Sequence, residues 1–214
     1  VVWLSERTGW RHAYRVPLDG GPAVPITNGE FDVIDVPAVD RTGGWVYYSA
    51  SPANATQKSL YRVRLDGSKT ERVSPEDQPG WHEYDAAPDA GWAVHTRSTF
   101  TTPPVVEVVR LDGHAVVRTL ADNAAVRAAL AAVARPEIEF LKVPVGGGVT
   151  LDGWSMKPAR TDPGAKLPLL MYVYGEPHGQ TVRDQWPGPR GLWHWMLAQR
   201  GFVVASVDNR GTNA

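Results

Sequence analysis

Cysteine is absent from the 214 residues, which excludes disulfide bonds and zinc sites built on thiolates. An excess of one charge is also lacking, because 22 Lys and Arg residues are offset by 23 Asp and Glu residues. Nothing in this balance points to nucleic acid or to an anionic membrane as a partner. No apolar run approaches the roughly 20 residues that span a bilayer, and no N-terminal signal pattern is visible. These absences leave the cellular compartment open.

Histidines in metal-binding spacing are lacking as well. None of the six falls in a His-Glu-x-x-His pattern or a similar arrangement. We therefore expect neither a metal nor another cofactor. The six are His12, His82, His95, His114, His178 and His194.

What is present begins with a repeat in the first 121 residues. Three segments alternate apolar and polar residues and end in the tight-turn pair Asp-Gly. Their final glycines, Gly20, Gly67 and Gly113, lie 47 and 46 residues apart. A period in the forties is typical of β-propellers.

Two further strands accompany each repeated segment. One precedes it and starts at Trp3, Trp45 or Trp92, and a short one follows the Asp-Gly pair. This is the pattern of a four-stranded propeller blade, and it predicts that residues 1–121 form two to three blades. A closed propeller needs at least about four blades, so we expect the others upstream or in another chain. The alternative is a small β-sandwich, which does not repeat so regularly.

Residues 122–214 follow a different pattern. After Asp122 and Asn123, candidate N-caps, an Ala-rich stretch carries apolar residues at helical spacing and ends before Pro136. Residues 137–143 and 149–156 then read as an antiparallel hairpin around three glycines.

Two apolar runs follow the hairpin, residues 167–173 and 202–207, and we expect each to be a strand buried on both faces of a sheet. Between them, a helix is predicted to present a stripe of Leu192, Trp193, Met196 and Leu197, with Gly201 just past its end. A hairpin, strand, helix and strand in this order indicate the N-terminal part of an α/β-hydrolase domain.

The loop after the first apolar run reads Val173-Tyr174-Gly175-Glu176-Pro177, with Gln180 following, and the second run ends in Asp208-Asn209-Arg210-Gly211. In both stretches the chain resembles the dipeptidyl peptidase IV-like branch of the prolyl oligopeptidase (S9) serine peptidase family. The resemblance implies β-propeller blades followed by a catalytic domain that removes N-terminal dipeptides with Pro or Ala in the penultimate position. It also implies a peptide substrate and a homodimeric parent protein.

The Ser–Asp–His triad that the resemblance implies is not found. The nucleophile of an α/β-hydrolase sits in a Gly-x-Ser-x-Gly elbow, and no such motif occurs. Gly153-Trp154-Ser155 resembles part of one, but the second glycine is missing and the segment belongs to the hairpin. We expect the triad beyond Ala214, and we expect the 214-residue chain itself to be inactive.

Tyr174 is the one candidate catalytic residue. Judged from the sequence alone, Tyr174 would be a tyrosine that packs beside Tyr172. Members of the resembled family, however, use a tyrosine at this position as a hydrogen-bond donor to the oxyanion. Glu176 stands where the family usually has glycine, and a carboxylate there is unfavourable near an oxyanion. We expect His178 to be a loop residue, and Asp208 and Arg210 to fix their loop.

Two other functions remain open. One is a related acylaminoacyl peptidase or oligopeptidase, and the absence of the family's substrate-gripping Glu-Glu pair would fit it. The other is a non-catalytic propeller module that binds protein or peptide, which would have no need of the second half of the chain.

Overall fold

The computed structural model describes residues 1–174, 176 and 178–212. The chain divides into two compact units. The first contains Val1–Thr99 and Pro104–Asp122, and the second contains Phe100–Pro103 and Asn123–Thr212. Each unit has its own sheets and its own buried side chains, and each is described by itself.

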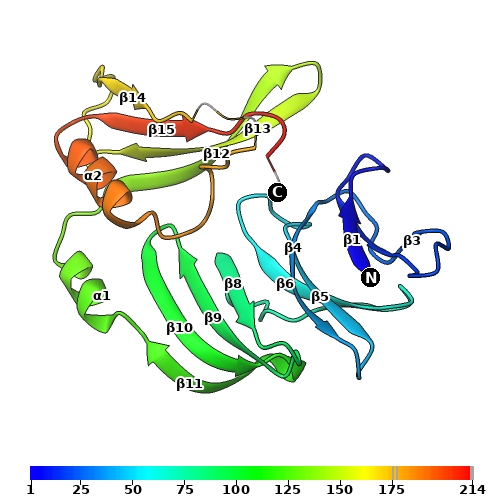
Figure 1. Ribbon diagram of the computed structural model, residues 1–214. Coiled ribbons are helices and arrows are strands. Elements are labelled where there is room, and N and C mark those ends of the chain that lie inside the picture. Colours follow the sequence, from blue (N-terminus) through cyan, green and yellow to red (C-terminus); the bar gives the residue numbers. More distant parts are fainter. Residues whose placement is uncertain (175, 177, 213–214) are drawn as a thin grey trace. The chain divides into compact units, whose positions relative to one another are not determined.

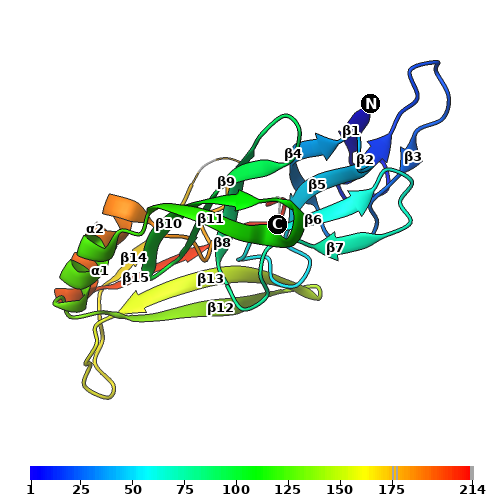
Figure 2. The same ribbon diagram turned by 90° about the horizontal axis from the view of Figure 1, so that it is seen from below.

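The first unit consists of three antiparallel sheets, each formed by consecutive strands (Figures 1 and 2). The first sheet contains β1 (Val2–Ser5), β2 (His12–Arg15) and β3 (Val24–Pro25). The second contains β4 (Val33–Asp40), β5 (Trp45–Ala50), β6 (Ser59–Arg64) and β7 (Thr70–Arg72). The third contains β8 (Trp81–Ala86), β9 (Trp92–Thr99), β10 (Thr102–Arg110) and β11 (Ala115–Ala121), with a short 3₁₀ turn at Asp112–His114.

The three Asp-Gly pairs occupy equivalent turns. Each lies between the last two strands of its sheet, and its glycine has a positive φ: 85° at Gly20, 76° at Gly67 and 71° at Gly113. Glycine reaches this region without steric cost, which explains why the pair recurs. The predicted repeat is confirmed.

Buried side chains are shared between neighbouring sheets of this unit. One cluster joins Ala13 and Ile26 of the first sheet region to Val46 and Val63 of the second. Another joins Tyr47 and Leu60 of the second sheet to Ala93 and Val109 of the third. Sheets that pack face to face in chain order are the arrangement of propeller blades.

The second unit contains one mixed sheet of four strands in the order β12-β13-β15-β14. Its members are β12 (Glu137–Gly146), β13 (Val149–Lys157), β14 (Leu169–Met171) and β15 (Val203–Val207). The β12–β13 hairpin is antiparallel, as predicted, whereas β14 and β15 run parallel. Two helices belong to the same unit, α1 (Ala124–Ala131) and α2 (Gly188–Gln199).

The helix α2 ends as its sequence predicts. Gly201 has a φ of 91° and its N–H donates to the carbonyl of Ala198, while the N–H of Phe202 donates to that of Leu197. These two bonds form a Schellman motif. The motif ends the helix and leads the chain directly into β15, whose carboxyl end lies at the candidate site.

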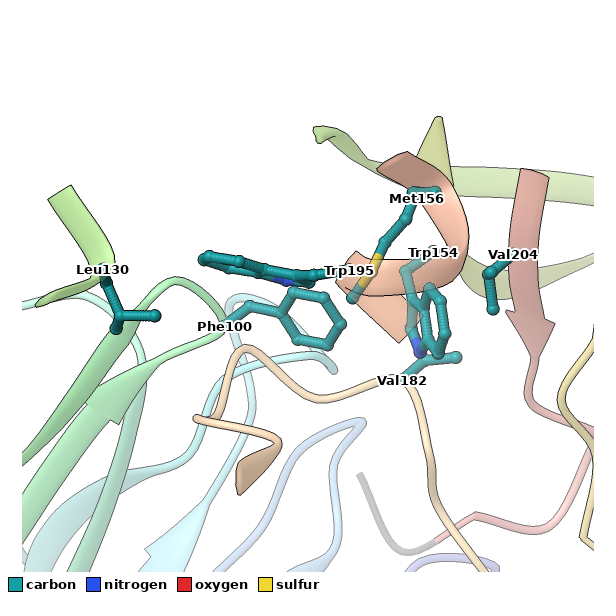
Figure 3. Packing of buried hydrophobic residues seen from close by; sticks show 8 residues of the cluster. Phe100, Leu130, Trp154, Met156, Val182, Trp195 and Val204 are labelled. Atoms are coloured by element: carbon teal, nitrogen blue, oxygen red, sulfur yellow. The ribbon is translucent and has the colours of Figure 1, made fainter. Parts of the chain in front are cut away.

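One face of the sheet and one face of α2 form the core of the second unit (Figure 3). Trp154, Met156 and Val204 of the sheet meet Trp195 and Ala198 of α2. Figure 3 shows Phe100 close to Trp195 and Trp154, and the ring centroids of Phe100 and Trp154 are 5.4 Å apart.

Two sequence predictions about this unit were wrong. The run 167–173 is not a strand buried on both faces, because β14 is the edge of the described sheet and Leu169 and Val173 are 60% and 69% exposed. The buried residues of α2 are Gly191, His194, Trp195 and Ala198, and of the predicted stripe Leu197 packs against the core. Leu192 and Trp193 were expected there, yet they are exposed.

Candidate functional site at the carboxyl ends of β14 and β15

Tyr174 lies three residues beyond β14, at the edge where two parallel strands end. Its hydroxyl donates to the side-chain oxygen of Asn209 at 2.6 Å, and the main-chain N–H of Asn209 lies 3.4 Å from the same hydroxyl oxygen. Asn209 is the second residue after β15. The tyrosine hydroxyl is therefore held by the loop that follows the neighbouring strand.

Gly179 allows the Tyr174 ring to lie where it does. A Cβ atom at this position would overlap the Tyr174 ring and would also lie 2.9 Å from the Glu176 carboxylate. The loop can fold back over the ring only because residue 179 has no side chain.

Asp208 fixes the loop to the end of β15. The residue is 4% exposed, and its carboxylate accepts bonds from the N–H and hydroxyl of Thr181, both at 2.8 Å, and from the N–H of Val182 at 3.0 Å. Several donors on one buried carboxylate make a strong and directional anchor. The expectation that Asp208 fixes its loop agrees with these contacts.

A second set of hydrogen bonds ties the anchor to the sheet. The Ser206 hydroxyl lies 2.7 Å from the Thr181 hydroxyl and donates to the Tyr172 carbonyl, also at 2.7 Å. The Trp154 indole N–H donates to the Thr181 carbonyl at 3.1 Å. These contacts connect the loop to two strands of the sheet, β13 and β15.

The electrostatic surroundings keep Tyr174 protonated. Burial raises the pKa of its hydroxyl above the usual value, and the nearby carboxylates of Asp208 and Glu176 act in the same direction. The main-chain N–H of Asn209 opposes them, but the net direction is upward. A neutral phenol can donate a hydrogen bond at neutral pH, so Tyr174 remains a donor.

A cavity of about 330 Å³ adjoins Tyr174. Aromatic side chains form much of its wall, including Phe100, Trp154, Trp186 and His194. Arg183 and Arg190 bring positive charge to the wall, and Glu176 brings negative charge. The wall thus combines aromatic rings with charged groups of both signs.

The other residues singled out in the sequence lie apart from this arrangement or outside it. Ser155 is buried in the middle of β13, and its hydroxyl has no hydrogen-bond partner among the described residues. His178 is exposed in a turn. Gly175 and Pro177 of the loop motif lie outside the described residues.

Two kinds of feature are absent from the described residues. No group of three or more His, Cys, Asp or Glu side chains is placed to hold a metal ion. No helix in the described part of the chain is long and apolar enough to cross a bilayer.

Sequence reasoning missed Asn209, Thr181 and Gly179 as parts of the site. A usable signal existed for Asn209, because it directly follows Asp208 at the end of an apolar strand, where ligands bind in open α/β sheets. Nothing comparable marks Thr181 or Gly179, whose contacts depend on how the loop folds back.

The chain is similar to several known proteins. Residues 1–104 match a family model described as the dipeptidyl peptidase IV (DPP IV) N-terminal region. Over 210 residues the chain is 32% identical to a probable dipeptidyl-aminopeptidase B of Emericella nidulans, covering 95% of this chain and 22% of that protein. It is 28% identical to a probable dipeptidyl peptidase 4 of the same organism, covering 99% of this chain and 27% of that protein.

Solved structures give a similar result. The crystal structure of Porphyromonas gingivalis dipeptidyl peptidase 4 matches with a TM-score of 0.89 and 31% identity, over all of this chain and 29% of that one. A putative dipeptidyl aminopeptidase IV from Bacteroides ovatus matches with a TM-score of 0.82 at 23% identity, over 99% of this chain and 32% of that one, and indicates the shared fold. The chain thus spans about a quarter of the length of the relatives it matches.

Proposed function

Because the chain belongs to the dipeptidyl peptidase IV-like family of S9 peptidases, we propose that it is part of a serine exopeptidase. The enzyme would release N-terminal dipeptides with Pro or Ala in the penultimate position. Its propeller blades would restrict access to small peptides, and residues 122–214 would begin its α/β-hydrolase domain. The full protein would act as a homodimer on peptide substrates.

Within that enzyme, we propose that Tyr174 stabilises the oxyanion. Acyl transfer places negative charge on the former carbonyl oxygen, and a donor aimed at that oxygen lowers the barrier. The observation that carries the proposal is the tyrosine hydroxyl, protonated and fixed between two strand ends beside an aromatic cavity.

The test is Tyr174→Phe in the full-length enzyme that contains this chain. The substitution removes one hydroxyl and keeps the ring that packs against Gly179, so the fold should be unchanged. One lost oxyanion donor costs about 10²–10³ in rate. The loss should appear in kcat and in kcat/KM alike, because the hydrogen bond strengthens in the transition state.

Tyr172→Phe is the matched control. The Tyr172 hydroxyl accepts a bond from Arg190, and its ring packs against the core one pleat deeper than Tyr174. Its loss should change kcat less than about threefold, within the effect of one exposed hydrogen bond. Equal losses in the two variants, or a Tyr174→Phe enzyme with nearly full kcat, would refute the oxyanion role.

A related acylaminoacyl peptidase would share the oxyanion chemistry but not the substrate. Chromogenic amides of Gly-Pro and Ala-Pro with a free amino terminus distinguish the two, since only a dipeptidyl peptidase needs that amine. Preference for the N-acetylated amino acid amide would support the alternative. The isolated 214-residue chain, in which we found no nucleophile elbow, should cleave none of these substrates.

A further inference from the structure

We propose that Asn209 is the positioning residue for the Tyr174 hydroxyl: its side-chain oxygen accepts the hydroxyl's hydrogen bond in the resting state, and the hydroxyl turns to donate to the oxyanion during acyl transfer. This inference rests on the proposed oxyanion role of Tyr174. It adds a second residue, on a different strand end, whose side chain would never touch the substrate.

The resting geometry determines where the single hydroxyl proton points. A separation of 2.6 Å to the Asn209 side-chain oxygen places the proton on the line to that acceptor. The main-chain N–H of Asn209 approaches the hydroxyl oxygen from another direction at 3.4 Å. One residue thus supplies both an acceptor for the proton and a donor to the oxygen, which fixes the phenol without using Tyr174's neighbours in the chain.

Asn209 can fix the phenol because the residue before it is itself anchored by hydrogen bonds. Asp208 is buried and anchored by three donors from Thr181 and Val182. The same loop carries Gly179, against which the Tyr174 ring lies. The Tyr174 ring and Asn209 are therefore both held by the contacts of Asp208 with Thr181 and Val182, and these contacts set the distance between them.

A neutral amide suits this task better than a carboxylate would. The phenol-to-amide bond is neutral, whereas a bond to an oxyanion is charge-assisted and about twice as strong. Turning the Tyr174 hydroxyl from Asn209 to the oxyanion is therefore favourable only once charge has developed, which is the differential binding that catalysis requires. The exposed Asn209 side chain can bind water once the Tyr174 hydroxyl no longer donates to it.

Charge at position 209 would reverse this preference. The carboxylates of Asp208 and Glu176 already act on Tyr174. A third carboxylate within hydrogen-bond distance would hold the hydroxyl proton tightly and would repel the oxyanion. Below its own pKa, the introduced acid would be neutral and would behave much like the amide.

The experiment compares Asn209→Ala and Asn209→Asp in the full-length enzyme, with a Gly-Pro chromogenic amide, between pH 6 and pH 8.5. For Asn209→Ala we expect kcat to fall about five- to tenfold at every pH, the equivalent of one neutral hydrogen bond, with KM changed less than twofold. For Asn209→Asp, whose carboxylate has an ordinary pKa of about 3.9 and is ionised throughout this range, we expect kcat to fall at least tenfold further than in Asn209→Ala.

The same substitutions in a Tyr174→Phe background complete a double-mutant cycle. Without the hydroxyl, Asn209→Ala should not lower kcat by more than about twofold. Asn209→Asp should lower it less than in the Tyr174 background, because only the repulsion of the oxyanion remains. Losses of equal size in both backgrounds, or an Asn209→Asp enzyme no slower than Asn209→Ala, would mean that Asn209 only supports the loop and would overturn the inference. If Tyr174→Phe itself keeps its kcat, the oxyanion role has failed instead, so the two failures are distinguishable.

Discussion

Acid should unfold the first unit through two buried histidines, His82 of β8 and His95 of β9. They are 1% and 0% exposed, and His82 Nδ1 lies 2.9 Å from His95 Nε2. The second ring nitrogen of His82 lies 2.8 Å from the Gln78 carbonyl, so it must be the donor there. Burial keeps both rings neutral at pH 7, so His82 Nδ1 accepts and His95 donates to it from Nε2.

The surroundings oppose protonation of either ring. Burial lowers the pKa of His82 to about 4, and His114, Arg72 and Arg97 contribute in the same direction. For His95, burial and the neighbouring histidines lower the pKa to about 2. The nearest carboxylate, Glu107, is 3.7 Å from His95 Nδ1 but does not offset the burial.

The magnitude follows from the difference between the folded and unfolded states. An unfolded histidine has a pKa of about 6.5 and takes up most of a proton as the pH falls from 7 to 5. The folded pair stays neutral over this range, so the unfolded state binds more protons and stability falls with pH. Integration gives about 2 kcal/mol for each histidine and about 4 kcal/mol for the pair. Such a loss is a large fraction of the stability of a typical domain.

The assay is amide hydrogen exchange of the peptide spanning residues 81–99, at pH 7 and pH 5, corrected for the intrinsic exchange rate. Protection should fall about a thousandfold at pH 5, which corresponds to the 4 kcal/mol above. His95→Phe keeps a ring stacked on Tyr84, whose centroid is 4.5 Å from that of His95, and removes one titrating group. Whatever its stability at pH 7, this variant should lose only about half as much between the two pH values.

His178→Gln is the matched control, because it removes an exposed histidine of the second unit. It should leave the pH dependence of the 81–99 peptide as in the wild type. A loss that is the same in His95→Phe as in wild type, or no loss between pH 7 and pH 5, would refute the assignment to the buried pair.

Two substitutions of glycine test the site and the fold separately. Gly179→Ala places a methyl group against the Tyr174 ring. Displacement of a catalytic group by about 1 Å can cost about 10²-fold, so kcat of the full-length enzyme should fall toward the Tyr174→Phe level. An unchanged kcat would contradict the packing described for the ring. The methyl group of Gly201→Ala meets no neighbouring atom, but the alanine must adopt a φ of 91°. Urea unfolding should therefore give a free energy of unfolding about 1 kcal/mol lower than that of the wild type. An equal or higher free energy of unfolding would rule out the Schellman motif.

The propeller blades could be predicted from the sequence because their signals are local. An Asp-Gly pair needs only its own glycine to form the turn, and the alternation of β6 and β10 depends on one strand at a time. The first strands of the second and third sheets, β4 and β8, were missed. β4 carries Asp35 and Pro37 within its length, and its pairing with β5 shifts register twice. Such irregularity breaks the alternation on which strand prediction depends.

The burial of β14 could not be predicted, because it depends on what covers the strand. An apolar run indicates only that its side chains can be buried on both faces. In the described sheet, Leu170 packs against the core while Leu169 and Met171 point to the uncovered face. The stripe of α2 was misassigned for a related reason, since Leu192 and Met196 line an apolar hollow beside α1.

The candidate site divides in the same way between local and non-local information. Tyr174 could be picked out only through its resemblance to a family, since a tyrosine after an apolar strand is otherwise a packing residue. Asp208 could be expected to fix a loop, because a carboxylate at a strand end has few other uses. Its actual donors come from residues 181 and 182, which are 26 or 27 positions away and carry no signal of their own. The partnership of Tyr174 with Asn209 depends on that anchor, and so becomes visible only once β14 and β15 are paired in register.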